Sequence, residues 1–138
     1  MNVSLLRNSF DMVVERQPMV TQRFYDILFA RYPQSQRLFA HTSRTVQERR
    51  LALALVAVME HLDDASWFRR TLGAMGDKHR GYGVTAEMYD WVGECFLATL
   101  AEAAGADWTP ELEREWTAAY GAIAGAMQAG AQAARRAA

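Results

Sequence analysis

The chain has 138 residues, a single cysteine and a formal net charge of −1 from 15 basic and 16 acidic side chains. This length predicts one domain, residues 1–138, that buries its core without an internal disulfide. The balanced charge argues against a nucleic-acid partner and against a polybasic membrane surface. The longest apolar run, residues 51–59, is too short to cross a bilayer, and residues 1–12 lack the apolar core of a signal peptide. We therefore expect a cytoplasmic protein that does not contact a membrane.

Helix-forming residues dominate, and only three prolines interrupt them. Apolar residues recur at helical spacing from Ser4, the expected N-cap, and again over residues 20–32. Pro33 ends the second helix, because the residue before a proline is disfavoured in the α region, and then opens a short helical turn up to Phe39. The pattern predicts an all-α fold.

A polar connection, residues 41–45, precedes a third long helix that Ser43 or Thr45 could cap. Its side chains expected to face inward are apolar and follow helical spacing: Val46, Leu51, Leu55, Val58 and Leu62. A further helix is expected to begin among Asp63, Asp64 and Ser66 and to end near His79.

Gly81 and Gly83 then predict a helix stop and a turn. The last two helices are expected at residues 86–104 and 110–131, the second beginning with an N-cap threonine and a first-turn proline. Alanine and arginine dominate residues 129–138 and offer little to bury, so we expect this tail to fray.

Short motifs along the chain occur in the order and spacing of a known family. They are Phe24-Tyr25, Leu28-Phe29, Pro33, Leu38-Phe39, Lys78-His79, Gly83-Val84, Tyr89, Trp116 and Tyr120. In this combination the chain resembles the globins, in particular single-domain bacterial haemoglobins of the Vitreoscilla type and the globin domain of flavohaemoglobins. The resemblance runs from about residue 5 to residue 127 and implies a globin fold of about seven to eight helices around a haem pocket.

The resemblance implies haem b as cofactor and His79 as the residue that ligates its iron. His79 lies at an expected helix end, just before Gly81, where the chain can turn away from the ring. Two other histidines are alternatives. His41 lies in the polar connection and could either meet a haem propionate or be a surface residue, whereas His61 is expected to be structural or exposed.

The same resemblance implies Tyr25 and Gln47 as hydrogen-bond donors that stabilise bound O2. Leu51 lies one helical turn after Gln47 and would wall the pocket with apolar surface. Phe39 would pack against the haem. The remaining expected pocket residues are Lys78, Val84, Tyr89, Val92 and Phe96.

In the resembled family, a tyrosine at the position of Tyr89 joins the proximal histidine and a glutamate of the last helix. Such a carboxylate makes the ligating imidazole more basic and favours O–O chemistry. Here the matching position is Ala131, and the nearby Gln128 and Gln132 are not acidic. This departure weakens the case for peroxidase-like or strong dioxygenase activity.

The resemblance implies a protein that binds O2 reversibly for storage or delivery, with CO and NO as further haem ligands. Two alternatives remain: a nitric oxide dioxygenase, and a diatomic gas sensor. The chain carries no dinucleotide-binding fingerprint and ends where a fused reductase domain would begin, so a dioxygenase would depend on a separate reductase. We expect a monomer or a homodimer.

Overall fold

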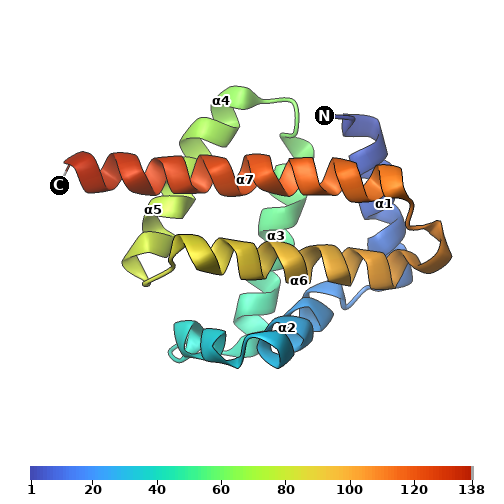
Figure 1. The fold of residues 1–138 in the computed structure, drawn as a ribbon, viewed down its shortest axis with the longest axis horizontal. Coiled ribbons are helices and arrows are strands. Elements are labelled where there is room, and N and C mark those ends of the chain that lie inside the picture. Colours follow the sequence, from blue (N-terminus) through green and yellow to red (C-terminus); the bar gives the residue numbers. More distant parts are fainter. Residues whose placement is uncertain (138) are drawn as a thin grey trace.

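A computed structural model describes residues 1–137, which form helices and connections without any strand. The seven α-helices are α1 (Val3–Arg16), α2 (Val20–Arg31), α3 (Arg44–Glu60), α4 (Ala65–Trp67), α5 (Gly73–Gly81), α6 (Ala86–Ala104) and α7 (Pro110–Ala137) (Figure 1). Three shorter segments complete the described part: η1 (Pro33–Phe39), the π-helical η2 (Phe68–Leu72) and η3 (Gly105–Asp107). The predicted all-α class is confirmed.

Side-chain caps set the helix starts. Ser43 Oγ accepts the Val46 N–H at 3.2 Å and begins α3, so Ser43 rather than Thr45 is the cap. Thr109 Oγ1 accepts the Leu112 N–H at 3.2 Å, as expected for the start of α7. The prediction that Ser4 caps the first helix is wrong: Asn2 Oδ1 accepts from Leu5, and α1 already begins at Val3. An asparagine side chain is as good an N-cap as a serine, and here it lies two residues earlier.

The helix expected from Asp63–Ser66 to near His79 is confirmed as a continuous helical run from Ala65 to Gly81, and it contains a π-helical turn that was not predicted. Asp64 Oδ1 caps the short α4 by accepting the Trp67 N–H at 3.0 Å. The chain then passes through the π-helical turn η2 before α5 begins. A π turn contains one more residue than an α-helical turn, so it changes the direction of the side chains that follow it. The turn after α5 lies at Gly83, whose φ of +93° is accessible to glycine.

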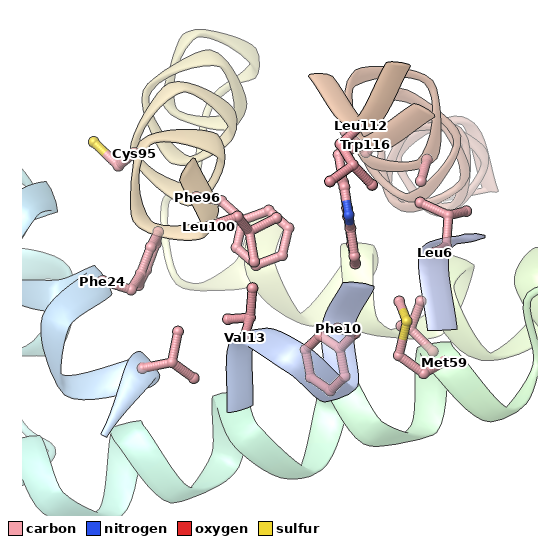
Figure 2. Packing of buried hydrophobic residues seen from close by; sticks show 14 of the residues in the cluster. Leu6, Phe10, Val13, Phe24, Met59, Cys95, Phe96, Leu100, Leu112 and Trp116 are labelled. Carbon is pink, nitrogen blue, oxygen red and sulfur yellow. The ribbon is translucent and has the colours of Figure 1, made fainter. Parts of the chain in front are cut away.

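Trp116 of α7 is the largest side chain among those that are fully buried, and it joins three helices (Figure 2). Its ring centroid lies 6.3 Å from that of Phe10 in α1 and 5.7 Å from that of Phe96 in α6. Its Nε1–H donates to Ser9 Oγ at 3.0 Å, so the indole is also satisfied as a hydrogen-bond donor. The core therefore holds α1, α6 and α7 together at one end of the molecule.

Helices α5 and α7 approach each other through glycines. A Cβ atom on Gly76 would overlap the carbonyl group of Met127, and one on Gly130 would overlap the backbone of Gly73. This contact explains a correction to the expected end of the chain. Helix α7 continues to Ala137 instead of ending near residue 131, and residues 129–137 of the expected frayed tail are helical, with Gly130 packed against α5. The last residue of that tail lies outside the described part.

Helix α3 is apolar on more than one side. Val58 and Met59 are buried, whereas Leu53 and Val56 are 65% and 47% exposed. Val46 was expected to face inward but is 44% exposed, because it lies seven residues before Leu53 and therefore on the same outer side of α3. Within residues 1–137, no helix is both long and apolar enough to span a membrane.

Candidate functional site

His79 lies in the last turn of α5, with its ring fixed by the preceding turn of the same helix. Its Nδ1 is 2.7 Å from the carbonyl oxygen of Met75, a distance at which Nδ1–H donates to that oxygen. In this tautomer Nε2 carries a free lone pair. Nε2 has no hydrogen-bond partner in the part of the chain that the structure describes, and the side chain is half-buried. The imidazole is thus oriented to offer one nitrogen to a metal.

Tyr25 of α2 and Gln47 of α3 meet side by side. The Gln47 amide nitrogen donates to the Tyr25 hydroxyl oxygen at 3.3 Å. Burial raises the pKa of Tyr25, an effect that the hydrogen bond from Gln47 partly offsets. The phenol therefore remains protonated at neutral pH, and its own proton is still available to a further acceptor.

Aromatic rings hold Tyr25 in place. Its ring centroid lies 5.0 Å from that of Phe24, 5.6 Å from that of Phe29 and 5.5 Å from that of Phe39. Tyr25 is only 4% exposed as a result. Phe39, expected to pack against haem, belongs to this cluster and remains half-buried.

Arg44, at the start of α3, is a positioning residue that was not identified from the sequence. Its guanidinium donates to the Asp26 carboxylate and, at 2.7 Å, to the Gln22 carbonyl oxygen, both in α2. It also pairs with Glu48 at 2.9 Å. These contacts tie the first turn of α3 to α2 and so hold Gln47 beside Tyr25. The Arg44–Glu48 spacing of four residues is visible in the sequence, but the bonds to α2 are not.

The expected wall residues come from several elements. Gln47, Leu51 and Leu55 follow one face of α3 at four-residue spacing. Leu51, Val84 and Val92 are half-buried apolar side chains packed against the core, and Phe96 is buried. Partly exposed apolar side chains of this kind gain burial if an apolar group lies against them.

Lys78 is exposed, and its place differs from that of the wall residues. It borders an open depression of about 510 Å³ on the face of α5 that also includes Met75 and Arg70. The depression combines two cationic side chains with apolar surface. His79 is not among the residues that line the depression, although Met75, whose carbonyl holds the imidazole, is.

Tyr89 is buried in α6, and its backbone carbonyl accepts a hydrogen bond from the Tyr120 hydroxyl at 2.6 Å. No carboxylate among the described residues bonds to Tyr89 or to His79. Ala131 lies at the expected acidic position, and Gln128 bonds to the Ala124 carbonyl oxygen of its own helix at 3.3 Å. The imidazole of His79 is therefore held by a neutral carbonyl.

The other two histidines lie apart from this arrangement. His61 stacks on Trp67 with ring centroids 4.4 Å apart and planes 6° from parallel, and its Nδ1 is 2.7 Å from the Ala57 carbonyl oxygen. His41 is exposed in the turn before α3. His61 thus shares with His79 the Nδ1 bond to the carbonyl four residues earlier, but its ring is stacked on Trp67, whereas His79 lies at the end of α5 just before the turn at Gly83.

The donor set fits haem. No group of three His, Cys, Asp or Glu side chains within residues 1–137 could hold a metal ion, so His79 would be a lone protein ligand. A porphyrin supplies four ring nitrogens to its iron and needs one axial imidazole. His79 has the free nitrogen that such a ligand requires, and the half-buried apolar side chains of η1, α3 and α6 suit the faces of a flat apolar ring.

A comparison with protein families matches residues 22–127 to the globin family. Similar curated proteins include the flavohemoproteins of Bacillus thuringiensis subsp. konkukian, 33% identical over 91% of this chain, and of Bordetella pertussis, 33% identical over 88% of it. In both cases the match covers 31% of the relative, so the chain spans about a third of the length of these proteins.

Similar folds occur among solved structures. An engineered carbene transferase, made from a proposed nitric oxide dioxygenase of Rhodothermus marinus, superposes with a TM-score of 0.84 at 27% identity, covering 98% of this chain and 94% of that one. A bacterial globin from Campylobacter jejuni gives 0.82 at 20% identity, covering 97% of this chain and 96% of the other.

Proposed function

This chain belongs to the globin family, and on that premise we propose that it holds one haem b through His79 and binds O2 reversibly. Family membership supports haem as the cofactor. The observation that carries the proposal is the state of His79: Nδ1 is engaged by the Met75 carbonyl at 2.7 Å, and Nε2 is left for iron. His61 makes the same kind of bond to Ala57, so the match of residues 22–127 to the globin family supports the choice of His79 beside this geometry.

Haem, when bound, supplies an iron to which a diatomic gas can coordinate. The residues of the chain perform the other tasks. His79 ligates and orients the iron through Nε2. Tyr25 holds a proton on a buried hydroxyl, and Gln47 bonds to the oxygen of that hydroxyl, so the proton is directed to another acceptor. We infer that this acceptor is bound O2, while Phe39 and Leu51 limit the access of water.

Absorption spectra of the purified chain test this proposal. We expect a ferric form with an intense Soret band, a mainly five-coordinate ferrous form and a stable CO complex, because Gln47 is a poor iron ligand. A protein that takes up no haem on reconstitution would overturn the proposal. A ferrous spectrum of the bis-histidine type would overturn the distal assignment and point to His41.

Nitric oxide dioxygenation is the second candidate function. The relatives named flavohemoprotein and the neighbour described as a proposed nitric oxide dioxygenase support it. The neutral partner of His79 favours simple binding, because a carbonyl raises imidazole basicity less than a carboxylate does. Oxygenated protein mixed with NO, alone and with an added flavin reductase and NADH, separates the two functions. Sustained nitrate formation with the reductase would establish the enzyme, and consumption that ends after one equivalent would favour the binding protein.

A further inference from the structure

The outer face of α3 carries four exposed residues in one line. Arg49, Leu53, Val56 and Glu60 are spaced four, three and four residues apart, and all four are exposed. With 3.6 residues per turn, their side chains fall within an arc of about 60° around the helix. Leu53 and Val56, at the centre, are 65% and 47% exposed. These exposed fractions are high for two neighbouring apolar side chains. We call these four residues the α3 stripe.

The α3 stripe lies away from the candidate site. By the same helical geometry, Leu51 is directed about 140–180° from the members of the stripe. Leu51 is half-buried, as are Gln47 and Leu55 on its side of the helix. Helix α3 therefore has one side that packs inward, next to Tyr25, and an opposite side that nothing in residues 1–137 covers.

The α3 stripe is complementary to itself. Its two charged residues and its two apolar residues have the same midpoint, between Ala54 and Leu55. If a second α3 lies antiparallel on the first, with a two-fold axis through that midpoint, Leu53 faces Val56 of the other copy. In the same register Arg49 faces Glu60 of the other copy, twice by symmetry, over a contact about 16 Å long.

Neither charged end of the stripe has an ion-pair partner within residues 1–137. The ion pairs found in residues 1–137 involve neither Arg49 nor Glu60. In the described part of the chain, the only bond to Glu60 from another side chain goes from Arg7 to the backbone carbonyl oxygen of Glu60. A carboxylate in the last residue of a helix also lies at the negative end of the helix dipole, where it is disfavoured. A cationic side chain from a second molecule, placed next to the Glu60 carboxylate, would offset this unfavourable interaction with the helix dipole.

We propose that the α3 stripe is a homodimer interface in which two copies of this chain pair antiparallel along α3. Leu53 and Val56 form its centre, and the Arg49–Glu60 pairs close its two ends and set the register. The interface is short, so the dimer is weak, since contacts below roughly 1,200 Å² are typical of transient complexes. The pairing places the α3 helices of two copies back to back, with Gln47 on the far side of each.

Sedimentation velocity of the full chain, from about 10 µM to 1 mM, tests the interface over the range where weak complexes of this size form. The wild type should pass from monomer to dimer as concentration rises. Arg49→Glu should weaken the dimer at least about tenfold, because it opposes like charges at both ends. Arg50→Glu is the matched control: it makes the same change in net charge on an exposed residue that lies outside the stripe.

The double variant Arg49→Glu, Glu60→Arg restores opposite charges across the two-fold axis, and should return the dimer to within about threefold of wild type. Leu53→Asp should abolish it. Far-UV circular dichroism checks that each variant is folded. A wild type that stays monomeric up to 1 mM would overturn the proposal, as would equal effects of Arg49→Glu and Arg50→Glu, or a double variant no better than Arg49→Glu alone. None of these outcomes depends on haem binding, so the proposed function is tested separately.

Discussion

Gly76 of α5 rests directly on the backbone of Met127 in α7: a Cβ atom at Gly76 would overlap the Met127 carbonyl group. A flexible side chain could move aside, but a helix backbone cannot do so without shifting the whole helix. The distance between α5 and α7 is therefore set by the absence of a side chain. Since His79 lies three residues further along α5, the same contact helps to fix where the imidazole is held.

The first prediction is that Gly76→Ala destabilises the protein by about 1–3 kcal/mol, the usual cost of overpacking a closed contact. Gly125→Ala is the matched control, because Gly125 faces open space in the interior of α7. Alanine there should stabilise by about 0.5–1 kcal/mol, since it favours the helix. Urea denaturation of both variants measures the difference. Equal free energies of unfolding for the two variants would show that the close contact is not formed.

Part of the fold follows from local sequence. Thr109 and Pro110 predict the start of α7, and Pro33 predicts both the end of α2 and the start of η1; the structure confirms these boundaries. Each signal acts within one turn of helix, through a cap or through a fixed φ angle. Such signals do not depend on which helices later pack together.

Other features depend on tertiary packing and were not predictable. Gly130 of α7 packs against Gly73, more than fifty residues away in the chain, whereas the helix beyond it agrees with the high helix propensity of alanine, glutamine and arginine. Val46 is the exception: it lies about 140° around the helix from Leu51, so its exposure follows from helix geometry alone. At the candidate site, Tyr25 and Gln47 were expected to act on the same ligand, but their direct hydrogen bond was not predicted. The bond from Arg44 to a backbone carbonyl of α2 was not predicted either, because no sequence pattern indicates it.

The second prediction concerns Tyr25. Tyr25→Phe removes the hydroxyl and almost no volume, so O2 dissociation should become about ten- to hundredfold faster, the effect of losing one charge-assisted hydrogen bond. Bound CO is less polar, and its dissociation should change much less. Stopped-flow displacement of both gases gives the comparison. If Tyr25 only packs against Phe24, Phe29 and Phe39, the two gases should instead show equal and small effects.

The third prediction concerns Cys95, the single cysteine, which is fully buried in α6. Burial raises the pKa of its thiol to about 11, above the ordinary value of 9.0. Because the thiolate is the reactive form, labelling of the native protein by a disulfide reagent at about pH 8 should be slow. The denatured chain should label quickly, with one equivalent.

The thiol of the unfolded chain loses its proton at lower pH than the buried thiol does. The free energy of unfolding should therefore decline between about pH 9 and 11 through this group. Rapid native labelling would contradict the burial.

The fourth prediction concerns the buried bond from Trp116 Nε1 to Ser9 Oγ. Ser9→Ala leaves the indole N–H without a partner and should cost about 1–3 kcal/mol. In a Trp116→Phe background there is no N–H to satisfy, so the same serine substitution should cost clearly less. Denaturation of the wild type, both single variants and the double variant gives the coupling energy directly. A coupling near zero would mean that the two side chains do not share this bond.

The central claim is that His79 holds haem iron, and its replacement by glycine tests this most directly. We predict that His79→Gly loses haem or binds it with an altered ferrous spectrum, and that added imidazole restores the five-coordinate form by entering the space left by the side chain. His61→Gly, which removes a histidine that stacks on Trp67, should keep the wild-type spectrum. A His79→Gly variant that retains haem with an unchanged ferrous spectrum, without imidazole, would contradict the account.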